Sequence, residues 1–354
     1  MKNDYLWDRS GEPDPELQRL EASLGKFRAK PGELDFSAIG SVTGQPRGFA
    51  WRMPRLAAAA LVAAGCAGML MLLFLPVSTV PPGTGWEVER IAGAPQVGRA
   101  ALPGSGMKSR LKVGELLVTD RSSRATLTVA DIGEVQVDPG SRVRLVETGA
   151  DRKRLSVELG TIHAAIWAPP GEFVVDTPSA TAVDLGCAYT LNVQEDGSGT
   201  LHTTLGWVGF HQDGHDSFIP AGAMCRTRPK QGPGTPFFED ASERLRATLE
   251  ALDFKELSLQ ARREALRTAL EEARPRDAFT LWHLLARVDG DERRQVVDRL
   301  ATLLPMPAGV TREGTLRLDT GMLDRWWNAF DLGDITIWRF WEQREPPRGK
   351  EAAR

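Results

Sequence analysis

The sequence contains few of the residues on which disulfide-rich or catalytic proteins usually depend. Its 354 residues include only three cysteines, five histidines and two tyrosines. Three cysteines are too few for a disulfide scaffold, and a net charge of −3 gives no general reason to expect direct binding of nucleic acid. The sequence also lacks a hydrolase elbow, a phosphate loop and a dinucleotide fingerprint. We therefore expect no enzymatic activity, no cofactor and no small-molecule substrate.

Charged residues are absent from residues 56–75, a run rich in alanine and leucine. An apolar helix of about 20 residues spans the hydrocarbon core of a bilayer, so this run predicts one transmembrane helix. Arg47, Arg52 and Arg55 precede it, and the next positive charge is Arg90. The positive-inside rule then places residues 1–55 in the cytoplasm and the rest outside a bacterial inner membrane. A signal peptide would have a much shorter charged leader, and a buried core helix is seldom so apolar.

The segment before this run contains one clear helical pattern, over about residues 15–30. Asp14 and Pro15 suit its beginning, and a Pro-Gly pair at 31–32 ends it. Helical spacing puts four apolar side chains on one stripe, which predicts a partner-binding face: Leu17, Leu20, Leu24 and Phe27. A lone short helix is marginal in water, so the stripe needs a partner protein, a second copy or a membrane surface. A loosely ordered tail is the alternative, and residues 32–50 are predicted to be a linker.

From residue 86 to about residue 230, apolar residues recur with a period of two between Gly, Pro and Asp turns. This pattern predicts an all-β domain of short antiparallel strands, arranged as a sandwich, a roll or a short solenoid. The clearest predicted strands are residues 115–119, 124–129, 134–137, 142–146, 155–159, 162–166, 173–176 and 188–193.

Several motifs in this region carry a family resemblance. They lie at residues 114–119, 123–129, 138–143, 155–163 and, most specifically, 175–189. The last stretch contains the signature residues Thr177, Pro178, Ser179, Ala180, Leu185 and Gly186. Residues 88–228 thus resemble the FecR domain of the iron-dicitrate sensor family. One position departs from that pattern, because Cys187 stands where threonine is usual.

The resemblance implies a single-pass inner-membrane regulator. Its periplasmic part would sense an outer-membrane transporter, and its cytoplasmic segment would control an alternative sigma factor. Such regulators usually carry a multi-helix sigma-binding domain, whereas residues 1–55 offer one convincing helix. Two interpretations follow. The first is a sensor, or anti-sigma regulator, that relays periplasmic protein binding to a cytoplasmic partner such as a sigma factor. The second is an envelope protein–protein interaction scaffold without a transcriptional role.

Two cysteines and three histidines in the β-rich region are candidates for a disulfide or a metal site. Cys187 and Cys225 lie on the side predicted to be oxidising, and they would form a disulfide if their strands are neighbours. The alternative is two buried free thiols. His202, His211 and His215 match no zinc-ligand spacing, so we predict no metal site.

Helical periodicity replaces the period of two after a Gly-Pro boundary at residues 232–236. It predicts an α-helical domain over residues 238–343, with Leu245 and Leu249 on one apolar stripe and Leu259 and Leu266 on another. Aromatic residues gather near the end, and we favour their burial over a binding surface: Trp326, Trp327, Phe330, Trp338, Phe340 and Trp341. Residues 344–354 are predicted to be a disordered tail. The whole chain is predicted to be an α+β multidomain protein.

Overall fold

The alternating apolar positions of the middle region form short strands. The structure is a computed structural model that describes residues 85–104, 107–212, 215–334 and 336. Every second residue of a strand points to the same face, so alternation buries one side, as it does in β6. The strands are β1 (Trp86–Ala92), β2 (Gln96–Val97), β3 (Ala100–Ala101), β4 (Lys108–Leu111), β5 (Leu116–Val118), β6 (Arg124–Val129), β7 (Gly133–Val137), β8 (Arg142–Thr148), β9 (Lys153–Ile166), β10 (Phe173–Asp176), β11 (Thr181–Asp184), β12 (Ala188–Val193), β13 (Gly199–Leu205), β14 (Trp207–Gln212), β15 (His215–Pro220), β16 (Ala223–Arg228), β17 (Gly232–Pro233) and β18 (Phe237–Phe238).

Four of the predicted segments lie outside the described residues. They are the helix at 15–30, the linker at 32–50, the membrane helix at 56–75 and the tail at 344–354. Of the helices that the structure describes, none has both the length and the apolar character needed to cross a membrane. The described residues all belong to one compact unit.

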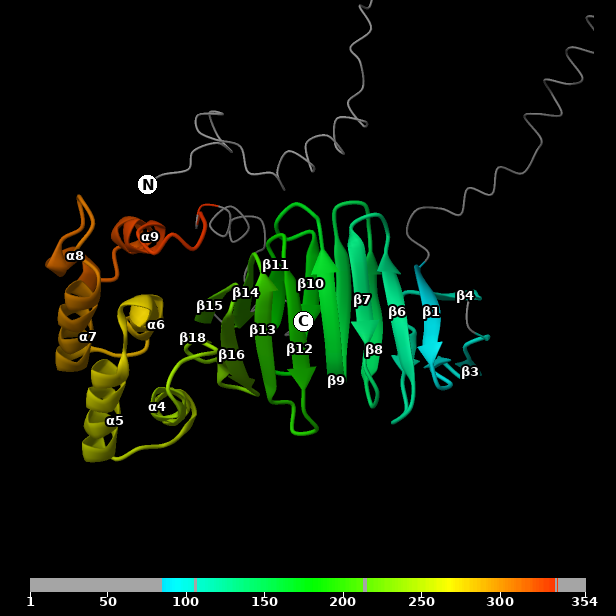
Figure 1. Ribbon diagram of the computed structural model, residues 1–354, viewed down its shortest axis with the longest axis horizontal. Coiled ribbons are helices and arrows are strands. Elements are labelled where there is room, and N and C mark those ends of the chain that lie inside the picture. The colour runs from blue at the N-terminus through cyan, green and yellow to red at the C-terminus, as the bar shows by residue number, and fades with distance from the viewer. Residues whose placement is uncertain (1–84, 105–106, 213–214, 335, 337–354) are drawn as a thin grey trace, which may run out of the picture. The chain divides into compact units, whose positions relative to one another are not determined.

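The strands pair into two sheets that share β9 (Figure 1). The first sheet has the order β4-β1-β6-β7-β9-β12-β13-β16, and β17 and β18 both pair with β16. The second has the order β3-β2-β5-β8-β9-β10-β11-β14-β15. Among these pairs only β9–β10 is parallel. The expectation of many short strands is confirmed, and the parallel pair departs from the purely antiparallel arrangement that the sequence predicted.

Strand β9 passes from one sheet to the other at Gly160. Its first half pairs with β8, and its second half pairs with β7 and β12. Gly160 has a φ of +95°, and a Cβ added there would lie 2.5 Å from the Cβ of Ser141. Glycine therefore lets the chain bend against the β7–β8 turn without ending the strand. The sequence predicted two strands here, at 155–159 and 162–166, and the structure joins them.

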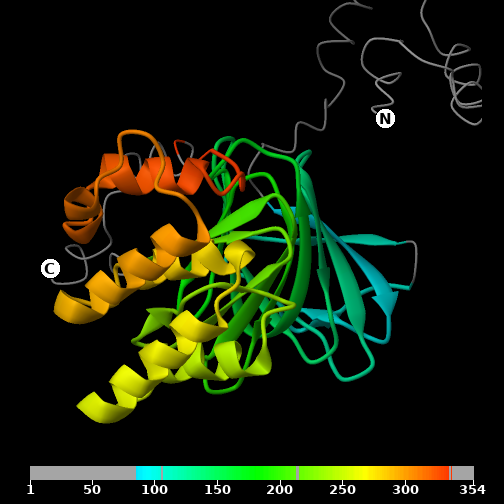
Figure 2. The same ribbon diagram turned by 60° about the vertical axis from the view of Figure 1, so that its left-hand side comes forward.

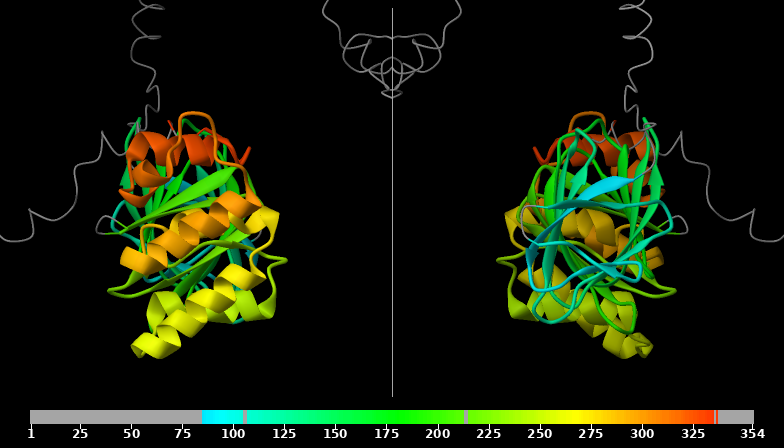
Figure 3. Two further views of the ribbon diagram at one scale, coloured as in Figure 1. Left: turned by 90° about the vertical axis from the view of Figure 1, so that its left-hand side faces the viewer. Right: turned by 90° about the vertical axis from the view of Figure 1, so that its right-hand side faces the viewer.

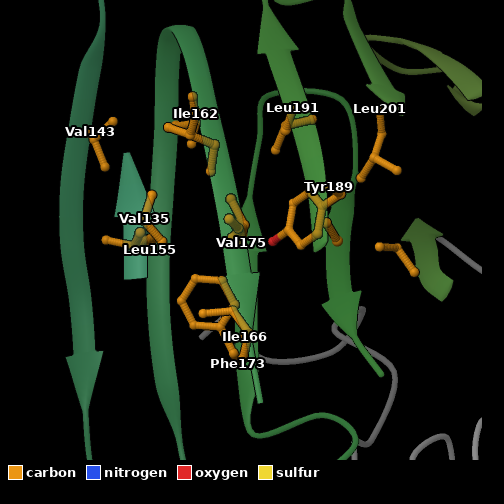
Figure 4. Close-up of a cluster of buried hydrophobic side chains, with 14 of the residues drawn as sticks. Val135, Val143, Leu155, Ile162, Ile166, Phe173, Val175, Tyr189, Leu191 and Leu201 are labelled. Carbon is orange, nitrogen blue, oxygen red and sulfur yellow. The ribbon is translucent and has the colours of Figure 1, made fainter. Parts of the chain in front are cut away.

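The hydrophobic core of the β region lies between the two sheets (Figure 4). Side chains from both sheets meet there and are inaccessible to solvent, among them Val135, Ile162 and Leu191 from the first sheet and Val143, Leu155 and Val175 from the second. Removing such side chains from water is the main favourable term in folding.

Helices cover the part of the β region that lies away from β1 and β4 (Figures 1 and 2). A second core forms between them and side chains of the sheets, including Val183, Trp207 and Phe218. Figure 3 shows the helical side in its left view and the β1–β4 side in its right view. The helices are α4 (Glu243–Phe254), α5 (Leu259–Glu272), the 3₁₀ turn η2 (Pro275–Asp277), α6 (Ala278–Leu284), α7 (Gly290–Leu303), α8 (Arg312–Leu316) and α9 (Thr320–Asn328).

Most of the apolar residues predicted for this region are buried. Leu245, Leu249 and Leu266 belong to the second core, and Trp326 and Trp327 are inaccessible to solvent. Leu259 is the exception, since 76% of it is exposed. It is the first residue of α5, next to the capping Ser258, and lies at the free end of the helix. The predicted aromatic residues at 338, 340 and 341 lie outside the described residues.

Candidate functional site: the signature hairpin and the entry edge

Signature residues 177–180 form the tight connection between β10 and β11. The last paired residues of the hairpin are Asp176 and Thr181. The Thr177 hydroxyl oxygen accepts the backbone N–H groups of Ser179 and Ala180 at 3.2 and 3.0 Å. The hydroxyl donates in turn to the carbonyl oxygen of Ala180 at 2.8 Å. Thr177 therefore replaces several backbone hydrogen bonds of the turn with its own side chain.

The same turn is fastened to the neighbouring strands by Ser179 and Pro178. The Ser179 hydroxyl is buried and lies 2.6 Å from the hydroxyl of Thr227 on β16. Pro178 lies against Gly197 in the β12–β13 turn, where an added Cβ would be 3.1 Å from the Cβ of Pro178. These contacts join distant parts of the sandwich, so these signature residues stabilise the fold.

The remaining signature residues, Leu185 and Gly186, form a turn closed by a buried carboxyl group. Asp184 Oδ1 accepts the N–H of Gly186 at 2.7 Å, and Asp184 Oδ2 accepts the thiol of Cys187 at the same distance. Burial raises the pKa of Asp184 to about 7, and these hydrogen bonds only partly oppose the effect. Tyr189 is buried beside this pair, and burial also raises the pKa of its phenol.

Cys187 and Cys225 are both free, buried thiols. Cys187 directly precedes β12 and Cys225 lies on β16, and these two strands pair with opposite sides of β13. Cys225 opposes Leu201, whereas Cys187 precedes the residue opposite Leu205, four positions along the strand. Neighbouring strands are about 4.8 Å apart and a disulfide needs Cα atoms within about 7 Å. The condition for the suggested disulfide is therefore not met, and the structure has the alternative, two separate thiols.

Two of the three candidate histidines lie beside carboxylates. His211 Nδ1 lies 2.6 Å from Asp216, and His202 Nε2 lies 3.2 Å from Glu239. The side chain of His215 is outside what the structure describes. Within the described residues no three His, Cys, Asp or Glu side chains gather in a way that would hold a metal ion.

A polar pocket opens beside β13, β16 and α4. Its lining includes Arg226, Arg228 and Glu250. Both guanidinium groups bind the Glu250 carboxylate, at 3.0 and 2.5 Å, and these contacts lower the pKa of Glu250 against the opposing effect of its burial. The charges of the pocket thus satisfy one another, so it gives no specific indication of an ionic ligand.

One row of residues runs across six strands of the first sheet. Its members are successive partners in the pairing: Glu87, Thr128, Glu134, Ala165, Ala188 and Leu205. We call this end of the sheet the entry edge, because β1 begins there at Trp86. The row is polar near the entry of the chain and apolar at its other end.

The apolar end of the row continues into an exposed cluster. Trp167 follows β9 and is 71% exposed, and Leu205 is 61% exposed. Pro169 and Pro170 in the next loop are also exposed, while Ala165 and Ala188 are half-buried between them. We call this set the apolar corner: Ala165, Trp167, Pro169, Pro170, Ala188 and Leu205. Exposed apolar groups that lie together are a usual sign of a contact surface.

The apolar corner contrasts with the rest of the outer face of the first sheet. The next two rows on this face, further from the entry edge, are polar. His163 Nδ1 lies 2.8 Å from the Thr190 hydroxyl, and the Asn192 amide donates to the Thr161 hydroxyl at 2.9 Å. Trp167 and Leu205 were not among the site residues predicted from the sequence. The sequence did contain a sign of this surface. Trp167 continues the alternation of outward-facing residues in β9, and a polar residue is expected at such a position.

Comparison with known proteins finds one family model that matches part of the β region. Residues 115–207 match the FecR protein family, so the resemblance that the sequence carries is confirmed for that stretch. Two crystal structures described as "a putative anti-sigma factor" from Parabacteroides distasonis are similar, each with 18% identity and a TM-score of 0.32. The matches cover 38% and 44% of this chain, and 64% and 74% of those chains. This chain thus spans just under two thirds of the first of them, and no curated protein matches it.

Proposed function

We propose that this chain is a single-pass inner-membrane regulator that carries a signal from a periplasmic protein partner to a cytoplasmic partner, such as an alternative sigma factor. The observation that carries the proposal is the FecR match over residues 115–207, which supports a role as a regulatory sensor. No catalytic step is part of the proposal.

The membrane arrangement rests on residues 56–75. Their length and lack of charge suit one membrane-spanning helix, and the three arginines before them favour a cytoplasmic N-terminus. In this arrangement residues 86–230 form the periplasmic FecR-like β domain and residues 238–343 the helical domain beside it. The apolar corner is then available on the periplasmic side.

The cytoplasmic end of the proposed relay is the stripe of Leu17, Leu20, Leu24 and Phe27. Its apolar side chains would lie in a groove of the partner, as amphipathic helices commonly do. A charge in the stripe would be buried without a partner and would weaken binding. Leu20→Asp is therefore the informative substitution. Ala22→Asp is its matched control, because helical spacing puts residue 22 on the opposite side.

The test is capture of the tagged full-length chain from membranes dissolved in mild detergent, followed by identification of bound proteins. We expect a sigma factor with the unchanged chain and with Ala22→Asp, and at least about a tenfold loss with Leu20→Asp, equivalent to ~1.4 kcal/mol. Capture of envelope proteins alone by all three chains would reject the relay.

That last outcome would favour the second candidate, an envelope protein–protein interaction scaffold without a transcriptional role. The observation behind this candidate is that residues 1–55 show one clear helical pattern rather than several. In a scaffold the N-terminal helix would serve only to anchor or pair the chains.

A further inference from the structure

We propose that the apolar corner rests on the lipid surface of the membrane in which the chain is anchored. The proposal rests on the membrane anchor of the proposed function. It adds a surface of the β sandwich that binds lipid and thereby orients the sandwich. The occupant is the bilayer interface, with Trp167 and Leu205 as the side chains that enter it.

The first argument is where the chain enters the sandwich. Glu87, one residue after Trp86, belongs to the same row as Ala165, Ala188 and Leu205. That row crosses five strand spacings, about 24 Å. Residues 76–85 separate the apolar run from β1 and reach at most about 33 Å when extended. A membrane anchor before residue 76 would therefore limit the distance between the start of β1 and the bilayer to about 33 Å, with the entry edge as the nearest end of the first sheet along the chain.

The second argument is the chemistry of the corner. Tryptophan is enriched at the membrane–water interface, because its ring is apolar and its N–H group is polar. Trp167 is 71% exposed, and the loop that carries Pro169 and Pro170 follows it directly. Residues in a loop at the end of a sandwich reach a flat surface before residues on its faces do. The corner contains no charged side chain whose desolvation would oppose the contact.

The third argument is the charge at the other end of the row. Glu134 is exposed and lies nearer the entry of the chain than Trp167 and Leu205 do, whereas the charge of Glu87 is offset by its ion pair with Lys108. Anionic lipids repel carboxylates at short range. The entry edge should therefore tilt so that Trp167 and Leu205, rather than Glu134, approach the headgroups.

The experiment uses the full chain in lipid nanodiscs of phosphatidylethanolamine and phosphatidylglycerol, with or without bromine on the acyl chains. A bimane label is placed at Ala221→Cys, in a Cys66→Ala background. Ala221 is exposed, and its N–H donates to Gly206 at 2.9 Å, so the label lies beside Leu205 without replacing it. Cys187 and Cys225 do not compete for the label, because both are buried.

Three comparisons are made. The matched label is Glu195→Cys in the exposed β12–β13 turn, at the opposite end of the first sheet. The test variant is Trp167→Ser with Leu205→Ser. Its control is Leu259→Ser, which removes a side chain that is 76% exposed but belongs to α5.

We expect brominated lipid to quench the label at 221 about threefold more than the label at 195, as for a group close to the interface. The double variant should remove that difference, and Leu259→Ser should keep it. Equal quenching at 221 and 195 in a chain that has entered the discs overturns the lipid contact and leaves the proposed anchor intact. A difference that survives the double variant overturns the assignment to Trp167 and Leu205. Failure of the chain to enter discs overturns the anchor itself, and the lipid contact with it.

Discussion

The imidazole of His283 holds the backbone of Phe218, 65 residues away in the sequence. The backbone N–H of Phe218 donates to His283 Nε2 at 3.0 Å, and His283 Nδ1 lies 2.9 Å from the carbonyl oxygen of Phe279. A carbonyl oxygen only accepts, so Nδ1 carries the proton and Nε2 is free to accept. Burial lowers the pKa of His283 to about 3, which keeps the ring neutral. This side chain therefore joins edge strand β15 to helix α6.

His283→Ala should destabilise the fold. The substitution leaves the buried N–H of Phe218 without its acceptor and opens a cavity among aromatic rings, at a cost of about 2–4 kcal/mol. Thermal unfolding followed by circular dichroism should show a clearly lower midpoint. The control is His202→Ala, since His202 is only partly buried in its contact with Glu239, and should change stability by about 0.5 kcal/mol or less. Equal shifts for both variants would contradict the role assigned to His283.

Asp184 should make stability depend on pH. Its pKa is about 7 in the folded chain because the carboxyl group is buried, and about 3.9 when unfolded. Between about pH 4 and pH 7 the carboxyl group is ionised in the unfolded chain but still protonated in the folded chain. Rising pH therefore lowers the free energy of unfolding, by up to about 1.4 kcal/mol per pH unit. Asp184→Asn cannot ionise and should lose this fall.

The stability of Asp184→Asn must be compared with that of the unchanged chain at each pH. His283 acts in the opposite sense over an overlapping range: its folded pKa is lowered, so its contribution is lost as the pH falls below about 6.5. The two trends offset each other in the unchanged chain. The urea midpoint of Asp184→Asn should therefore rise relative to that of the unchanged chain between pH 4 and pH 7. Parallel curves would show that Asp184 does not titrate in this way.

Local patterns were enough to predict seven of the 18 strands that the structure describes. Period-two alternation identified residues 124–129 and 188–193 at the bounds that β6 and β12 have in the structure. Burial on one face of a strand is a local consequence of its sequence. The signature at residues 177–186 was found through its resemblance to the FecR family, and the structure shows that its residues form two tight turns.

The pairing of strands and the surfaces that result could not be predicted in the same way. The parallel neighbours β9 and β10, and the position of β13 between β12 and β16, depend on contacts between distant segments. For that reason the disulfide between Cys187 and Cys225 was plausible in sequence and is absent from the structure. The apolar corner was missed for the same reason, because residues 165, 188 and 205 meet only through the register of three strands.

Both thiols should react slowly with alkylating reagents in the folded chain. Burial raises the pKa of Cys187 and that of Cys225, the latter to about 12, so little thiolate forms near neutral pH. We expect maleimide modification to be about a hundredfold faster, or more, after unfolding in urea without reductant. Peptide mapping should then recover Cys187 and Cys225 as modified thiols. Recovery of a linked peptide pair from protein purified without reductant would contradict the separation seen here.

Gly160→Ala should strongly destabilise the β region. The new Cβ would lie 2.5 Å from the Cβ of Ser141, and a φ of +95° is strained for any residue with a side chain. Gly114→Ala separates the two causes, because Gly114 has a φ of +86° but nothing within 4 Å of an added Cβ. We expect about 1–2 kcal/mol of destabilisation at Gly114 from backbone strain alone. At Gly160 we expect about 3–5 kcal/mol, since the close contact must also be relieved at the point where β9 changes sheets. Urea unfolding of the two variants in parallel measures the difference, and equal losses would mean that the β7–β8 turn yields to the extra methyl group.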